Sequence, residues 1–161
     1  MPLRTAVVTG ANKGLSIQEE HICAQPFFPR PLRSLTPLSS RSAGIGLAIV
    51  RALALRYPTS ALHAASPGAP LNIFLTARSP SRGAAAVASL HADEALSASK
   101  VLRKDGGLVT IEFAQLDVDP KQQSISEFAL QLKDRFASEG GAGGLDILVN
   151  NAAMASDAQS A

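Results

Sequence analysis

The sequence predicts an α/β protein built on a doubly wound parallel sheet. Short apolar runs alternate with longer segments of helical period, as expected when each strand is followed by a crossover helix. One of these runs, Asn72–Ala77, is apolar almost throughout, which is typical of a parallel strand covered on both faces. The first apolar run also leads directly into a glycine-rich turn.

The first half of the chain gives two strands and one helix. A strand is expected at Leu3–Thr9, and a helix over Gly46–Tyr57 ends where Pro58 removes the next backbone donor. The stretch Thr59–Pro70 is rich in Ala, Ser, Pro and Gly, so it is expected to be a loop. The second strand, Asn72–Ala77, follows.

The second half continues the alternation. An alanine-rich helix is expected over Ser81–Ser99, and a third strand over Leu108–Leu116. Asp119-Pro120 resembles a helix start, with Asp as the N-cap and Pro at the first helical position.

That helix ends at Gly140–Gly144, and Leu145–Val149 is the fourth strand. Its apolar stripe consists of Ile125, Phe128, Leu132 and Phe136. The β-α order predicts right-handed crossovers in a Rossmann-type doubly wound sheet, truncated after the fourth strand.

Two segments depart from this order. Residues 15–44 carry four prolines with Ser and Arg between them and no sustained period, so they are expected to be a disordered insert. Residues 154–161 form a polar tail. The expected domain is therefore residues 1–153, interrupted by the insert.

Composition narrows the classes of partner. The net charge of +2 and the 4% aromatic content argue against a nucleic-acid surface. No apolar run reaches the roughly 20 residues of a membrane span, and no signal peptide is expected before a strand that begins at Leu3. The single cysteine, Cys23, excludes an intrachain disulfide. A cytoplasmic protein without membrane partners is expected.

The most informative motif is a nucleotide-binding fingerprint in two pieces. Thr9-Gly10-Ala11-Asn12-Lys13-Gly14 follows the first strand, and the pattern resumes at Gly44-Ile45-Gly46. Without residues 15–44 the sequence reads TGANKGIGLAIVRALA, a strand, a glycine turn and a helix start. This arrangement holds a dinucleotide pyrophosphate. Either Gly14 or Gly44 could supply the middle glycine.

Two arginines follow the second strand. Where an acidic residue would bind a ribose 2′-hydroxyl, Arg78 instead suits a 2′-phosphate, and Arg82 could add a second guanidinium. The alternative is that both are solvated side chains at the start of a helix.

Polar residues end the third and fourth strands as well. Asp117 could accept the amino group of adenine or could simply support a turn. In Asn150-Asn151-Ala152-Ala153, asparagine could contact the cofactor ribose, fix the turn, or do both.

No metal site is expected. His21 and Cys23 have a ligand-like spacing, but they lack further ligands and a rigid frame. His63 and His91 have no carboxylate or nucleophile placed near them and are interpreted as incidental surface residues.

Together these motifs resemble the short-chain dehydrogenases/reductases, and most of all their NADPH-dependent carbonyl reductases. The resemblance rests on TGANKG with GIG, on Asp117 after the third strand, and on NNAA in place of NNAG. It implies the cofactor NADP(H), held by Gly10, Asn12, Lys13, Gly14 or Gly44, Ile45, Gly46, Arg78, Arg82, Asp117, Val118 and Asn150.

The resemblance does not supply catalytic residues. Family members continue to a catalytic Ser and a Tyr-x-x-x-Lys pair, and the only tyrosine here, Tyr57, lies on the first helix. We therefore assign no catalytic residue and expect the chain alone to be inactive. A small carbonyl substrate is expected only for a complete version.

Two other interpretations stay open. The chain could be a non-catalytic nucleotide-binding or interaction module whose proline-rich insert contacts a partner. It could also be the unstable product of a retained intron or a mispredicted gene, because removing the 30-residue insert restores the fingerprint in frame.

Overall fold

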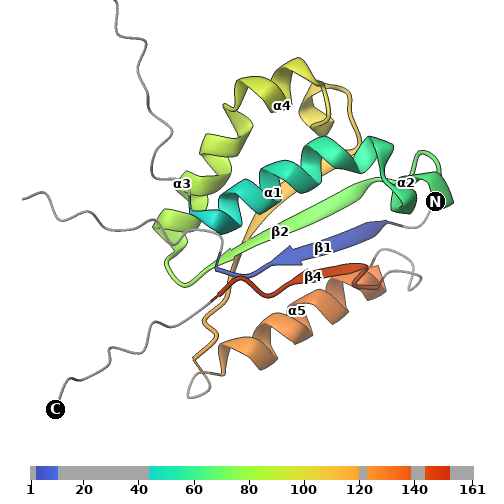
Figure 1. The fold of residues 1–161 in the computed structure, drawn as a ribbon. Helices are drawn as coiled ribbons and strands as arrows, with labels where there is room; N and C mark the ends of the chain where they lie inside the picture. The colour runs from blue at the N-terminus through green and yellow to red at the C-terminus, as the bar shows by residue number, and fades with distance from the viewer. Residues whose placement is uncertain (1–2, 11–43, 120–122, 139–143, 153–161) are drawn as a thin grey trace, which may run out of the picture.

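The computed structural model describes residues 3–10, 44–119, 123–138 and 144–152 (Figure 1). It contains one all-parallel sheet of four strands, β1 (Arg4–Val8), β2 (Leu71–Ala77), β3 (Val109–Gln115) and β4 (Ile147–Val149). Their order in the sheet is β3-β2-β1-β4, which is the order of the first four strands in a Rossmann-type sheet. The predicted fold class is confirmed.

Helices cover both faces of the sheet (Figure 1). Helices α1 (Ile45–Arg56), α3 (Pro80–His91) and α4 (Glu94–Ala98) lie on one face, and α5 (Ser124–Ser138) lies on the other. The chain moves outward from β1 to β2 to β3 and then back past β1 to β4. Connections of one hand therefore place the helix before β4 on the opposite face from α1 and α3.

The core follows the alternation of the strands. In β1, Ala6 and Val8 pack in the cluster with α1, while Val7 packs with Phe74 and Phe128 on the α5 side. All seven residues of β2 are buried, because this strand has a neighbour on each edge and helices on both faces. The continuous apolar character of Asn72–Ala77 reflects this central position.

The segment predicted as a loop over Thr59–Pro70 contains a helix. A 3₁₀ turn at Tyr57–Thr59 holds Pro58, and α2 spans Ala61–Ala65. Ser60 caps α2, since its Oγ accepts the amide of His63 at 3.2 Å. Because Thr59–Pro70 is rich in small and polar residues, its composition favours a loop and does not indicate that Ser60 begins a helix.

The single helix predicted over Ser81–Ser99 is divided into α3 and α4. Asp93 lies at the break and caps α4, with its Oδ1 accepting the amides of Ala95 and Leu96, both at 3.0 Å. Arg51 of α1 donates from Nε to Asp93 Oδ2 at 2.8 Å and fixes the corner. The break is thus caused by a tertiary ion pair together with a local cap.

The helix start predicted at Asp119-Pro120 is wrong. Residue 123 lies in a turn and α5 begins at Ser124. Asp119 instead donates its amide to Asp117 Oδ1 at 3.1 Å, so it belongs to a turn that follows β3. The insert at residues 15–44 falls outside the described residues except for Gly44, and the tail at 154–161 does so entirely.

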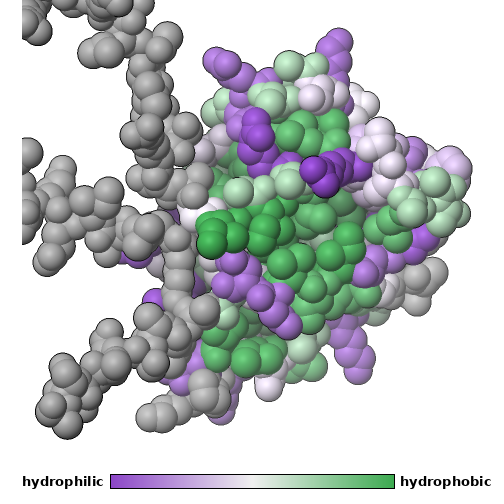
Figure 2. All heavy atoms as spheres, in the orientation of Figure 1, coloured by the Kyte–Doolittle hydropathy of each residue, from purple (hydrophilic) through white to green (hydrophobic). Residues whose placement is uncertain are grey.

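The surface around α1 is largely apolar. Figure 2 shows hydrophobic residues gathered over α1 and the strands beside it, with hydrophilic residues around them. Ile45, the first residue of α1, has 75% of its surface exposed. The beginning of this helix therefore presents an apolar side chain to the outside.

Candidate functional site

The parallel strands bring most of the described candidate residues to one edge of the sheet. Gly10, Arg78, Asp117 and Asn150 each follow a different strand at its carboxyl end. The direction of winding reverses between β1 and β4, and ligands of open α/β sheets bind outside the carboxyl ends at such a point. The topology thus defines the candidate site.

The turn after β1 requires glycine. Gly10 has φ +63°, and a Cβ at this position would lie 2.7 Å from the Cα of Ala152. The left-handed conformation and the close approach of a second backbone each disfavour a side chain. The absence of a side chain at Gly10 therefore allows the first turn to pack closely against the segment that follows β4.

Thr9 and Asn151 join the same two segments by hydrogen bonds. Thr9 Oγ1 accepts the amides of Asn151 and Ala152 at 2.9 and 3.0 Å. Asn151 Nδ2 donates to the carbonyls of Thr9 and Gly10, both at 3.1 Å. Of the two asparagines, Asn151 supports the turn, whereas Asn150 is exposed.

Thr9 and Asn151 were not among the predicted site residues. A signal was present, since a polar residue ends each of two strands that a Rossmann-type order makes neighbours. Which of the adjacent asparagines faces β1 depends on the strand register, which the sequence does not give.

The N-terminus of α1 lies at the same edge (Figure 1). Gly44 is its N-cap without a side-chain hydrogen bond, and the first turn holds no acidic residue. Ile45 is exposed and Gly46 is buried. The first amides of a helix have no partner within it and carry partial positive charge, so this end of α1 is suited to an anion. Asn12, Lys13 and Gly14 lie outside the described residues.

The two arginines after β2 are exposed. Arg78 directly follows β2, and Arg82 lies in the first turn of α3. Neither guanidinium forms an ion pair with any residue that the structure describes. Positive charge at the N-terminus of a helix opposes its dipole, so an anionic ligand would relieve this arrangement.

Asp117 supports the turn after β3. Its amide donates to Ser124 Oγ at 2.9 Å, and its Oδ1 accepts the amide of Asp119. Val118 is half-buried and packs against the α5-side cluster. The turn-supporting role considered for Asp117 is therefore present, and it occupies one of the two carboxylate oxygens.

Arg78 and Asp117 line a common groove of about 620 Å³. This volume lies within the range of small-molecule sites. The remaining lining is mostly polar and comes from β3 and the first half of α5: Gln115, Gln123, Ser124, Glu127, Phe128 and Gln131. The structure thus brings two of the predicted residues together, whereas Gly10 and Asn150 do not line this groove.

Tyr57 is a structural residue far from this edge. It lies at the end of α1, next to the start of β2, and its hydroxyl donates to the carbonyl of Ala69 at 2.7 Å. Burial raises the pKa of its phenol above the ordinary value. Its side chain is enclosed in the core.

The described ranges hold no group of three or more His, Cys, Asp or Glu side chains that could bind a metal ion. His21 and Cys23 lie outside those ranges. Within the same ranges, no helix has both the length and the apolar character needed to cross a membrane.

Comparison with known proteins adds no relative: no family model, curated protein or solved structure matches the chain. The fold and the edge define a four-stranded α/β protein of Rossmann-type order with a candidate ligand site at the carboxyl ends of its strands. Any narrower assignment rests on the chemistry of the residues.

Proposed function

We propose that the chain is the NADP(H)-binding half of an oxidoreductase of the short-chain dehydrogenase/reductase type. The observation that carries the proposal is the junction of Gly10 with the segment after β4, beside the N-terminus of α1, whose N-cap Gly44 has no side chain to occupy the first amides. This junction lies at the reversal point of the sheet, the place where dinucleotides bind in Rossmann-type folds.

The residues present fit a dinucleotide with an additional phosphate. The amides at Gly44–Gly46 would receive the pyrophosphate, with Asn12, Lys13 and Gly14 as further expected ligands. Arg78 and Arg82 would bind the 2′-phosphate, since both guanidinium groups are exposed and have no ion-pair partner in the described part of the chain.

Two further positions serve the adenosine. Asp117 and Val118 would contact adenine through the carboxylate oxygen that the Asp119 amide does not use. Asn150 is exposed, whereas Asn151 is hydrogen-bonded to the first turn, so Asn150 would be the asparagine that contacts a ribose of the cofactor.

No residue is assigned to catalysis. When bound, NADPH would supply the hydride for carbonyl reduction, and the residues named above would bind and orient it; none of them is assigned as a proton donor. We therefore expect cofactor binding without turnover from the 161-residue chain. A small carbonyl compound would be the substrate of a complete version only.

Calorimetric titration with NADPH and NADH tests the proposal. We expect NADPH to bind at least tenfold more tightly, and Arg78→Ala to remove most of that preference. Arg103→Ala is the matched control, because Arg103 is an exposed arginine in the 3₁₀ turn Arg103–Asp105, away from the carboxyl edge. Equal affinity for both cofactors, or no binding of either, would contradict the proposal. NADPH-dependent turnover by the chain would contradict the expected inactivity.

A further inference from the structure

We propose that the outer edge of β3 binds an extended peptide segment of a partner protein, which adds a fifth strand and places one apolar side chain in a hollow beside α5. β3 ends the sheet on this side and spans seven residues, whereas β4 at the other end spans three. The hollow shares Gln115, Phe128 and Gln131 with the groove of Arg78 and Asp117, whereas the β3 backbone with which the peptide would pair is not part of the proposed cofactor site.

The backbone hydrogen bonds show which groups face outward. The Leu71 amide donates to the carbonyl of Leu108, and the Leu116 amide donates to that of Ala77, so even-numbered residues of this strand face β2. Ile111, Phe113 and Gln115 therefore direct their N–H and C=O groups to the outer edge. These groups have no hydrogen-bond partner among the residues that the structure describes.

The same edge already pairs with one extended residue, Leu102, where β3 begins. The Val109 amide donates to the carbonyl of Val101 at 3.0 Å, and Leu102 forms a parallel bridge with Val109. The chain then turns away in the 3₁₀ turn at Arg103–Asp105. A peptide paired with Ile111–Gln115 would extend the pairing that Leu102 makes with Val109 along the rest of this edge.

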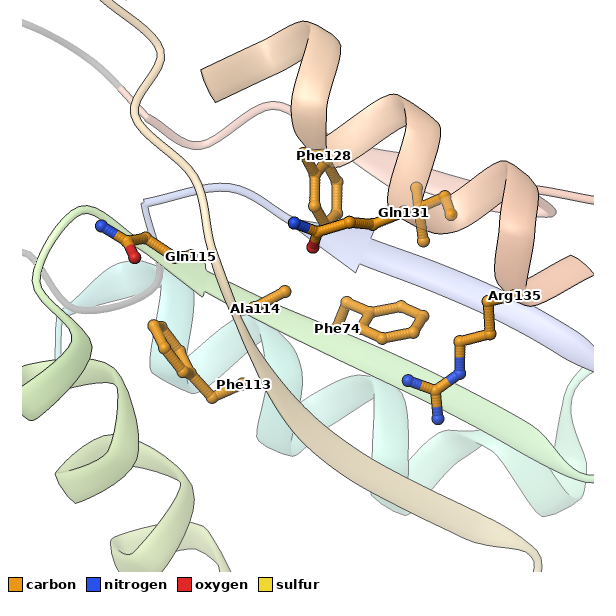
Figure 3. Close-up of a pocket in the computed structure, with 8 residues that line it drawn as sticks. Phe74, Phe113, Ala114, Gln115, Phe128, Gln131 and Arg135 are labelled. Carbon is orange, nitrogen blue, oxygen red and sulfur yellow. The ribbon is translucent and has the colours of Figure 1, made fainter. Parts of the chain in front are cut away.

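A hollow of about 220 Å³ lies beside this open part of β3 (Figure 3). Its walls come from β2, β3 and α5 and are mainly apolar: Phe74, Phe113, Ala114, Gln115, Phe128, Gln131, Leu132 and Arg135. Alternate side chains of an added strand point to opposite faces. One side chain of the peptide would therefore reach this hollow while its neighbours stay outside.

The charges indicate an apolar, uncharged side chain. Glu112 is the only charged residue in β3, and Arg135 binds both of its carboxylate oxygens, at 2.7 and 2.9 Å. The Arg135 guanidinium also lies 5.0 Å from the centre of the Phe74 ring. Edge strands are commonly blocked by lysine or proline, and β3 contains neither.

Fluorescence anisotropy with the full chain tests the proposal. The probe is a labelled peptide, Thr-Val-Thr-Phe-Thr-Val-Thr, which has β propensity and one aromatic side chain at its centre. We expect saturable binding, at least tenfold weaker for a peptide with Thr in place of Phe, and none for a peptide with Pro at alternate positions. Failure of the Phe peptide to bind at about 1 mM would overturn the proposal.

Two protein variants locate the binding. Ala114→Lys places a long charged side chain in the hollow and should weaken the Phe peptide at least tenfold. Thr110→Lys carries the same change on the same face of β3 but outside the hollow, and should leave affinity within about twofold. Circular dichroism checks that each variant is folded. If a variant is not folded, the affinities of the three peptides for the unaltered chain test the proposal. Equal effects of the two variants would overturn the placement.

Discussion

Gly10 is the residue at which the first turn meets the segment after β4. Two independent constraints act there, because φ is positive and the Ala152 backbone occupies the space of a side chain. Neighbouring Thr9 and Asn151 then use their polar groups on each other's backbone. These contacts fix the backbone around the proposed pyrophosphate site before any ligand binds.

Substituting alanine at Gly10 and at Gly106 separates the two constraints. Both glycines have positive φ, but a Cβ at Gly106 would meet nothing within 4 Å. Each variant carries the left-handed penalty of about 1–2 kcal/mol, and only Gly10→Ala adds the clash with Ala152. We expect the larger loss of unfolding free energy for Gly10→Ala in urea titrations; equal losses would show that the close approach does not matter.

The adjacent asparagines give a second matched pair. Asn151→Ala leaves the carbonyls of Thr9 and Gly10 without their side-chain donor and should cost about 1–3 kcal/mol of stability. Asn150→Ala should change stability by less than about 0.5 kcal/mol because this side chain is exposed. Under the proposed function it should still weaken NADPH binding. Thermal unfolding and calorimetry measure the two effects separately.

At the scale of elements, the corner between α3 and α4 depends on one carboxylate. Burial by itself raises the pKa of Asp93, but the hydrogen bond from Arg51 and those from the Leu96 and Ala95 amides outweigh it and lower the pKa below its ordinary value. The folded protein therefore favours the ionised form. This contribution to stability is present above the unfolded pKa of about 3.9 and is lost as pH falls through the lower folded pKa.

The Asp93→Asn variant tests this linkage. Asparagine retains an oxygen that can cap α4 but removes the charge that pairs with Arg51. Near neutral pH the loss should stay below about 1 kcal/mol, since the Arg51 side chain is 43% exposed. The unfolding free energy of the variant should fall less than that of the parent between about pH 5 and pH 2. Parallel pH profiles would exclude Asp93 as a source of the acid sensitivity.

The short strand β4 is also attached to β1 at its amino end, through the carboxylate and the amide of Asp146. Asp146 accepts from Arg4 Nη1 at 2.7 Å and from the amide of Thr5 at 2.8 Å. Its own amide donates to the carbonyl of Thr5 at 2.9 Å. Because β4 has only three residues, these bonds at one end and those of Thr9 and Asn151 at the other carry much of its attachment to β1.

At the scale of the whole molecule, the interruption of the fingerprint has a modest entropic cost. Thirty-six residues separate the end of β1 from the start of α1, and six would remain without residues 15–44. The logarithmic dependence of loop closure on length makes this difference about 1.6 kcal/mol. That is small beside the 5–15 kcal/mol stability of typical domains, so the long connection is compatible with the fold.

Deleting residues 15–44 is therefore expected to stabilise the protein by about 1–2 kcal/mol. It should also strengthen NADPH binding, because Gly14 would then precede Ile45 directly and the amides of the turn would be held next to those of α1. Thermal unfolding and calorimetric titration of the two chains provide the comparison. A deletion variant with lower stability and no gain in affinity would contradict the restored-fingerprint hypothesis.

The sequence by itself determined the α/β class, the four strands and the residues that end them, because apolar periodicity and glycine turns are local properties. It did not predict the division of α3 from α4, the start of α5 at Ser124, or the choice of Asn151 over Asn150 as the support of Gly10. The start of α5 depends on the turn after β3, in which Ser124 Oγ accepts the amide of Asp117. The other two depend on a partner distant in the chain or on strand register: Arg51 for Asp93, and the pairing of β4 with β1 for Asn151. Such contacts exist only after the sheet has assembled, so only the tertiary structure could decide them.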